Sequence, residues 1–250
     1  MNPYREANAR LAPLETFDPN VFVSDAEFPP EMCHFVLALA VVYNDLRDLM
    51  VAYMCLEPIL PPMNTGPTPA VGNVMGVSVH LMRSFAGVLH EAFELIRSNS
   101  DVVESAKFKQ IVSNLHPEAR ESWLALAAVA EGKAISSPLT KMLLFARNKV
   151  AFHYDPKEIA RGFRLAFIGT GREPYVSRGQ SMAEARFYFA DAAVSEYMNI
   201  AGDTAAAGDF MKARTQVFHQ VNHALREIVF GFVVKRRAGW RQPSVSAPTT

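Results

Sequence analysis

The strongest constraint on the fold is the segment from Pro29 to Pro58, in which apolar residues recur at helical spacing between two prolines. Proline suits the first turn of a helix and follows soon after its end. The segment therefore predicts a helix over about 30–56. Its longest apolar run, residues 35–43, is far shorter than the roughly 20 residues needed to cross a bilayer, so we expect a helix buried against protein, with no membrane partner.

Helical periodicity interrupted by proline- and glycine-rich stretches recurs along the rest of the chain. Apolar positions near a 3.6-residue period mark further helices, and a Pro/Gly-rich stretch over 58–73 and the segment 166–180 predict loops. No Asn-Gly or Asp-Gly hairpin signal and no internal repeat is present. The pattern predicts an all-α fold, an antiparallel bundle of long helices with additional short ones. The expected helices cover about 73–98, 101–114, 117–131, 136–154, a restart at Asp155-Pro156, 181–201 and 208–236.

Three regions differ in their composition. Residues 1–28 contain three prolines and no sustained period, which predicts an irregular N-terminal arm. Residues 29–236 hold all the periodic segments, and we expect them to form a single α-helical domain. Residues 237–250 are polar and predict a disordered tail.

Bulk composition excludes several classes of protein. The formal net charge is zero, so overall charge selects no partner. Cys33 and Cys55 form neither a disulfide framework nor a Cys-x-x-Cys metal pair. The N-terminus has no apolar signal-peptide core. We therefore expect a cytoplasmic protein in a reducing compartment.

Charge is unevenly distributed along the chain. Residues 1–60 hold three basic and nine acidic side chains, whereas residues 141–186 hold nine basic and four acidic ones. The basic stretch either faces the phosphates of a nucleic acid or packs beside the acidic N-terminal part.

A polar motif follows the apolar helix predicted over 136–154. The sequence RNKVAFHYDP contains Arg147 and Asn148 with His153 six residues after the arginine. This arrangement resembles the signature of the HEPN superfamily, whose members are α-helical bundles and include metal-independent endoribonucleases of bacterial defence, toxin–antitoxin and stress systems. The resemblance implies a homodimer that pairs two motifs at its interface, with Arg147, Asn148 and His153 as the catalytic residues.

The chemistry of these side chains suits RNA cleavage. Histidine titrates near neutral pH and can serve as a base or an acid, and arginine holds a phosphate bidentately while staying charged. One histidine cannot easily be both acid and base in a single step, but two copies from two subunits can. We expect RNA as substrate, with no metal and no cofactor.

Helical geometry complicates this arrangement. Six residues place Arg147 and His153 about 120° apart on an ideal helix. Arg147 instead shares a face with Tyr154, and Lys149 shares one with His153, so both neighbours are candidate supporting residues. Either the helix ends before His153, as Asp155-Pro156 favours, or residues of two chains form the site.

Two further polar residues interrupt the first long helix. Asn44 and Asp45 lie among apolar neighbours, so at least one points inward or both are solvated. A buried carboxylate needs a partner, and Arg147 or His153 would suit. Asn44 and Asp45 are therefore also candidate supporting residues.

Two other classes of function compete with a ribonuclease. The first is a non-catalytic helical binding module of HEPN-like fold, which holds an antitoxin or another protein partner. The second is a metalloprotein that uses His219 and His223, whose i, i+4 spacing permits a shared metal. Two ordinary helix histidines are the commoner explanation of that spacing.

Overall fold

The computed structural model describes residues 16–56, 59, 68–133, 156–178, 180–181, 185–201 and 204–236 of the 250. Within these ranges the chain forms α-helices and one 3-10 turn, with no β-strand, which confirms the all-α class. The elements are η1 (Pro19–Phe22), α2 (Pro30–Leu56), α3 (Pro69–Ser98), α4 (Ser100–Glu104), α5 (Ala106–Ser113), α6 (Pro117–Ala130), α8 (Pro156–Phe167), α9 (Tyr188–Ala201) and α10 (Thr204–Lys235).

Prolines and hydroxyl caps set most of the helix starts. Helices α2, α6 and α8 begin at a proline, as the sequence predicts, and α3 also begins at one, Pro69. Helix α3 starts earlier than the predicted residue 73, because the Thr68 hydroxyl accepts a hydrogen bond from Val71 N at 3.2 Å. The segment predicted as one helix over 101–114 is two helices. Ser105 is extended between them, and its hydroxyl accepts from Phe108 N at 3.3 Å.

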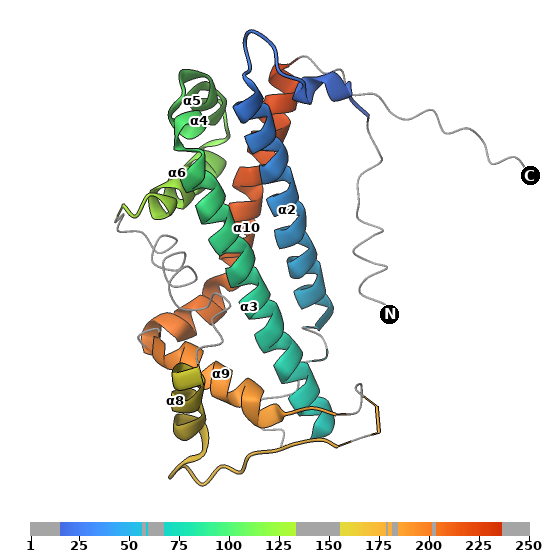
Figure 1. Ribbon diagram of the computed structural model, residues 1–250, viewed down its shortest axis with the longest axis vertical. Helices are drawn as coiled ribbons and strands as arrows, with labels where there is room; N and C mark the ends of the chain where they lie inside the picture. The colour runs from blue at the N-terminus through green and yellow to red at the C-terminus, as the bar shows by residue number, and fades with distance from the viewer. Residues whose placement is uncertain are drawn as a thin grey trace, which may run out of the picture.

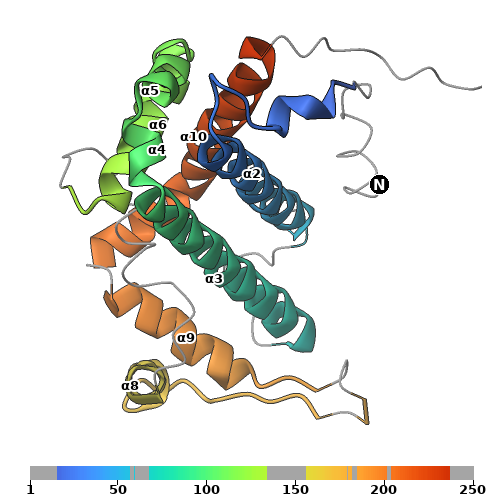
Figure 2. The same cartoon turned by 45° about the horizontal axis from the view of Figure 1, so that its top comes forward.

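Three long helices build the frame of the molecule. Helix α2 runs antiparallel to both α3 and α10, and contacts both (Figure 1). Helix α6 packs against α10 and α3, so four helices converge on one core (Figure 2). Its centre is aromatic: the ring centroids of Phe35, Phe108 and Trp123 lie 5.4 to 6.4 Å from one another, and all three side chains are buried.

Helices α8 and α9 form a smaller unit at the end of the molecule opposite η1 (Figure 1). They pack closely on each other, and α9 also contacts α3 and α10. The connection between them makes one antiparallel bridge, in which Ser177 N donates to Arg186 O at 2.8 Å and Arg186 N donates to Ser177 O at 3.0 Å. This unit lies away from the aromatic core and presents its outer surface to solvent.

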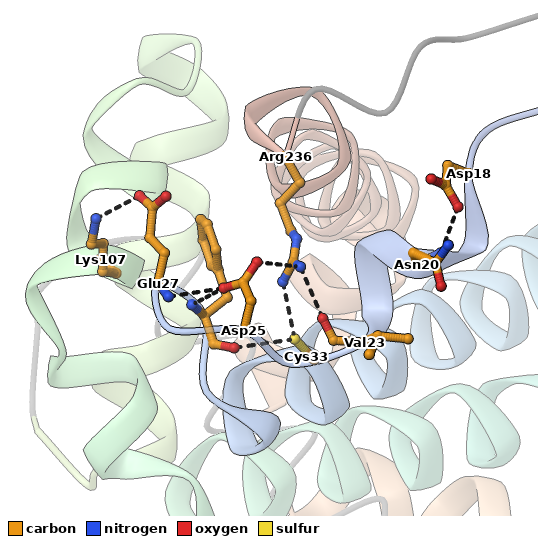
Figure 3. Close-up of polar contacts among 9 residues, drawn as sticks. Asp18, Asn20, Val23, Asp25, Glu27, Cys33, Lys107 and Arg236 are labelled. Atoms are coloured by element: carbon orange, nitrogen blue, oxygen red, sulfur yellow. Dashed lines mark hydrogen bonds and ion pairs between the residues drawn. The ribbon is translucent and has the colours of Figure 1, made fainter.

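An arginine at the end of α10 fixes the N-terminal segment to the bundle (Figure 3). Arg236 Nη2 donates to Asp25 Oδ2 and to Val23 O, both at 2.8 Å, and its guanidinium lies 4.8 Å from the Phe28 ring centroid. The Phe28 N–H, which donates to Asp25 Oδ1 at 2.7 Å, is the main cause that lowers the pKa of the Asp25 carboxyl. Residues 16–28 are irregular outside η1, yet they are anchored.

A cavity of about 550 Å³ adjoins this junction. Most of its charged groups have ion-pair partners, Glu27 with Lys107 at 2.6 Å and Asp25 with Arg236, while Asp18 accepts a hydrogen bond from Asn20 N at 2.9 Å. Lys235 Nζ donates to Gln110 Oε1 at 2.5 Å. The junction therefore has a structural role, which is to hold the N-terminal segment on α5 and α10.

Candidate functional site

The predicted catalytic residues lie outside the described part of the chain. Arg147, Asn148, Lys149, His153 and Tyr154 all fall within residues 134–155, so their roles stay predictions. In the sequence, His153 comes three residues before Pro156, the first residue of α8. The described neighbour of the motif is therefore the α8–α9 unit.

Asn44 and Asp45 do not point into the core. Both side chains are exposed on α2, whereas Leu46 beside them is fully buried. The interpretation that one of them is a buried polar group is wrong, because α3 and α10 cover the opposite face of α2. Their supporting role beside the motif stays a prediction.

The exposed face of α8 is basic. Lys157, Arg161 and Arg164 follow i, i+4, i+7 spacing, which places them on one side of the helix, and all three are exposed. We call these three residues the basic face. Glu158 Oε2 lies 3.8 Å from Arg161 Nη1, and Arg164 has no hydrogen-bond or ion-pair partner among the described residues.

The basic face makes no ion pair with the described residues of the acidic N-terminal part. Within the described ranges no ion pair joins residues 156–196 to residues 16–56. The arginines nearby that are paired use α9 instead: Arg172 binds Glu196 at 3.1 Å and Arg186 binds Asp191 at 3.0 Å. The described ion pairs of the basic stretch thus lie within α8 and between the following loop and α9. Which of its two alternatives holds stays a prediction.

A close backbone contact sets the orientation of α8. Gly162 is buried against α9, and a Cβ added there would lie 2.1 Å from Ala193 O and 3.1 Å from Tyr197 N. Only glycine permits this approach, and it turns the side of α8 opposite the basic face toward α9. Gly162 thus determines which residues of α8 remain in solvent.

We expect Gly162→Ala to loosen α8. Real Cβ atoms essentially never approach backbone oxygen this closely, so α8 must shift, at a cost of about 1–3 kcal/mol. Amide hydrogen exchange in α8 should become faster by the factor to which this loss of free energy corresponds.

Gly231→Ala in α10 is the matched control. Its added Cβ would meet Ile111 at 3.7 Å and Leu115 at 3.9 Å, which is ordinary contact. That variant should gain about 0.5–1 kcal/mol, because glycine is a poor residue inside a helix. Unchanged exchange in α8 of the Gly162 variant would contradict the expectation.

An aromatic pocket lies at the C-terminal end of α8. It is a cleft of about 600 Å³ between the loop after α8 and the first turns of α9. We call it the aromatic pocket, and it is lined by Phe167, Gly171, Arg172, Glu173, Tyr175, Tyr188, Phe189 and Ala192. Arg164 precedes Phe167 by one helical turn, so the basic face ends one turn from this wall of the pocket.

Hydrogen bonds hold the walls of the pocket in place. The Tyr188 hydroxyl donates to Pro69 O at 3.2 Å, and Phe189 N donates to Tyr175 O at 3.3 Å. On the other wall, the Arg172 guanidinium lies 5.8 Å from the Phe167 ring centroid while it binds Glu196. The loop can turn tightly between these walls because Gly171 has φ of 73°.

The start of α9 is fastened to α3 by a second arginine. Arg186 Nη1 lies 3.3 Å from Asn73 Oδ1, and the same guanidinium binds Asp191. It occupies space that a side chain at Gly76 would fill, since a Cβ there would lie 1.9 Å from Arg186 Nη2. The pocket wall formed by residues 188–192 is therefore positioned by polar contacts to the main bundle.

The chain matches no protein-family model, no curated protein and no solved structure. The HEPN assignment therefore remains a resemblance carried by the motif. The α-helical bundle that it implies is present, and the particular HEPN arrangement of helices stays a prediction.

The described residues form no ligand set for the alternative of a metal site at His219 and His223. The rings of His219 and His223 lie 6.0 Å apart between centroids, and that of His116 lies 6.2 Å from His223. Among the described residues, no group of three or more histidine, cysteine or carboxylate side chains is placed to hold a metal ion.

No helix in the described part of the chain is both long enough and apolar enough to cross a membrane.

The sequence reasoning missed the aromatic pocket. Its walls come from residues 167–175 and 188–192, segments in which aromatic residues alternate with no clear helical or strand period. The available signal was compositional: an arginine and two aromatic residues in a glycine-rich loop, followed by Phe187-Tyr188-Phe189.

Proposed function

We propose that the protein binds single-stranded RNA along the basic face of α8 and cleaves it without a metal ion. The observation that carries the proposal is the exposed basic face of α8, which ends one helical turn before an aromatic pocket. Proteins that hold single strands combine positive charge along the backbone with aromatic rings on which bases stack. RNA meets both requirements.

Chain connectivity supports the proposal that His153 acts near this surface. Three residues span at most about 11 Å, so the backbone of His153 lies no further than that from the first residue of α8. An RNA strand that lies on Lys157, Arg161 and Arg164 would pass within reach of the motif.

The proposed reaction uses one histidine from each subunit of a homodimer. Neutral His153 removes the proton from a 2′-hydroxyl, and the 2′-oxygen attacks the adjacent phosphorus. The P–O5′ bond breaks, and the partner subunit's His153, in its protonated form, gives a proton to the 5′-oxygen. Arg147 stabilises the charge that develops on the phosphate. The products are a 2′,3′-cyclic phosphate and a 5′-hydroxyl.

The binding-module alternative uses the same surface without the reaction. The basic face and the aromatic pocket are sufficient to hold a strand, and neither requires Arg147 or His153. A role in bacterial defence or stress, and an antitoxin as partner, are part of the ribonuclease proposal. A cleavage assay on the purified protein separates the two functions.

We expect the double variant Arg161→Ala and Arg164→Ala to weaken RNA binding equally for all sequences. Each arginine that contacts a phosphate contributes about 0.7 to the slope of log affinity against log salt concentration for single strands. The slope should therefore fall by about 1.4. Fluorescence anisotropy with 2′-O-methyl oligonucleotides, which lack the attacking hydroxyl, measures binding without cleavage.

Arg120→Ala is the control for this experiment. Arg120 is an exposed arginine on α6, away from the α8–α9 unit, so its loss should leave the salt slope nearly unchanged (Figure 1). If the double variant keeps the wild-type slope, RNA does not lie on the basic face and the binding proposal is wrong.

A further inference from the structure

The aromatic pocket has the size and walls of a nucleobase site. Binding pockets for small ligands enclose about 300–1,000 Å³, and this cleft of about 600 Å³ falls within that range. Four aromatic side chains line it, and every base offers a π-face to such rings. Tyr175 is 42% exposed, so its ring is accessible from solvent.

One carboxylate in the pocket is available to read a base. Glu173 lines the cleft, is exposed, and has no hydrogen-bond or ion-pair partner among the described residues. The other charged group of the lining, Arg172, is already engaged with Glu196 and lies over Phe167. The free recognition group of the pocket is therefore an acceptor with two oxygens.

The four bases present different sets of donors and acceptors to such a carboxylate. Guanine presents two adjacent donors, N1–H and the N2 amino group, which match the two carboxylate oxygens. Adenine and cytosine each present one donor beside an acceptor, and uracil presents one donor between two carbonyl oxygens. A carboxylate therefore gains two hydrogen bonds with guanine alone and opposes an acceptor on each of the other bases.

We propose that the aromatic pocket binds a guanine base of single-stranded RNA, stacked on Tyr175 and its aromatic neighbours, with the Glu173 carboxylate on the Watson–Crick edge. This inference rests on the proposed RNA binding by α8, and it adds the base for which the protein selects. The strand would run from the phosphates on Arg164 to the base in the pocket one helical turn further on.

The test is fluorescence anisotropy of the full chain with 2′-O-methyl heptamers of uridine that carry G, A, C or U at the central position. The heptamer with central G should bind about 10-fold more tightly than the other three. Glu173→Gln should remove this preference, because the amide offers one acceptor and one donor in place of two acceptors. In this variant the affinities for the four heptamers should agree within about 2-fold.

Substitutions at Tyr175 test the stacking separately. Tyr175→Ala should weaken binding of the heptamer with central G by about 10-fold, in line with the loss of one stacked base. Tyr175→Phe should keep the wild-type affinity. Glu118→Gln, at an exposed glutamate on α6, is the control that should change nothing.

The outcomes distinguish this inference from the proposed function. Equal affinity for the four heptamers in the wild-type protein would overturn the guanine site while leaving RNA binding in place. A guanine preference that persists in Glu173→Gln would overturn the role of the carboxylate. Binding to vesicles of phosphatidylglycerol with no binding to any heptamer would overturn both proposals, because the basic face would then serve a membrane surface. Cleavage of unmodified RNA is measured independently and decides the catalytic proposal alone.

Discussion

Replacing His153 with alanine should reduce RNA cleavage by about 10²–10⁴-fold, the usual cost of removing a general acid–base group. Arg147→Ala should also abolish cleavage, because charge on the phosphate would no longer be stabilised. Arg147→Lys should recover only a small part of the cleavage activity, since lysine lacks the planar fork that binds two phosphate oxygens. Cleavage by the wild-type protein should persist in EDTA. Gel analysis of end-labelled RNA, with and without EDTA, measures all four results.

The controls separate catalysis from folding. Each variant should keep the wild-type circular dichroism spectrum and the wild-type affinity for a 2′-O-methyl oligonucleotide within a few fold. His34→Ala, at an exposed histidine of α2, should cleave like the wild type. If the His153 and Arg147 variants fold and still cleave at the wild-type rate, the catalytic proposal is wrong and the binding module takes its place.

Trp123→Ala should lower the free energy of unfolding by about 3–5 kcal/mol. Trp123 is 2% exposed, and its ring packs against Phe35 and Phe108 where α2, α5 and α6 meet. Alanine would leave a cavity in this aromatic cluster that neighbouring helices cannot readily close. Urea unfolding followed by far-ultraviolet circular dichroism is the suitable measurement, because the substitution removes one of two tryptophans.

Leu124→Ala is the matched control for Trp123→Ala. Leu124 is the next residue on the same helix but is 52% exposed, so its truncation should change stability by less than about 0.5 kcal/mol. A loss below about 1 kcal/mol in Trp123→Ala would show that this cluster is not the centre of the core.

Much of the local structure was predictable because its causes are local. The prolines at residues 30, 117 and 156 mark the starts of α2, α6 and α8, since proline has the backbone angle of a first helical turn and lacks an N–H that would otherwise be unpaired there. The break at Ser105 escaped prediction. A serine inside an apolar pattern either continues a helix or caps the next one, and here its side chain caps Phe108.

The orientation of side chains around each helix was less predictable. In α2, Leu37 and Val41 are 48% and 56% exposed, although both belong to an apolar run that suggests burial on every side. Asn44 and Asp45 lie on the exposed face too. A mixed pattern of this kind predicts a helix but not which of its sides is buried. That side is set by the neighbouring helices that cover it, which here are α3 and α10.

The sequence by itself determined that this chain is helical and where most of its helices begin, and it contains the histidine and arginine motif on which the catalytic proposal rests. Periodicity, proline geometry and side-chain chemistry act within a few residues, so one chain segment contains all of that information. Only the tertiary structure decided that the basic face of α8 stays in solvent and that aromatic residues from two segments enclose one pocket. Both depend on contacts between distant residues, namely Gly162 against Ala193 and Arg186 against Asn73, whose pairing no local pattern encodes.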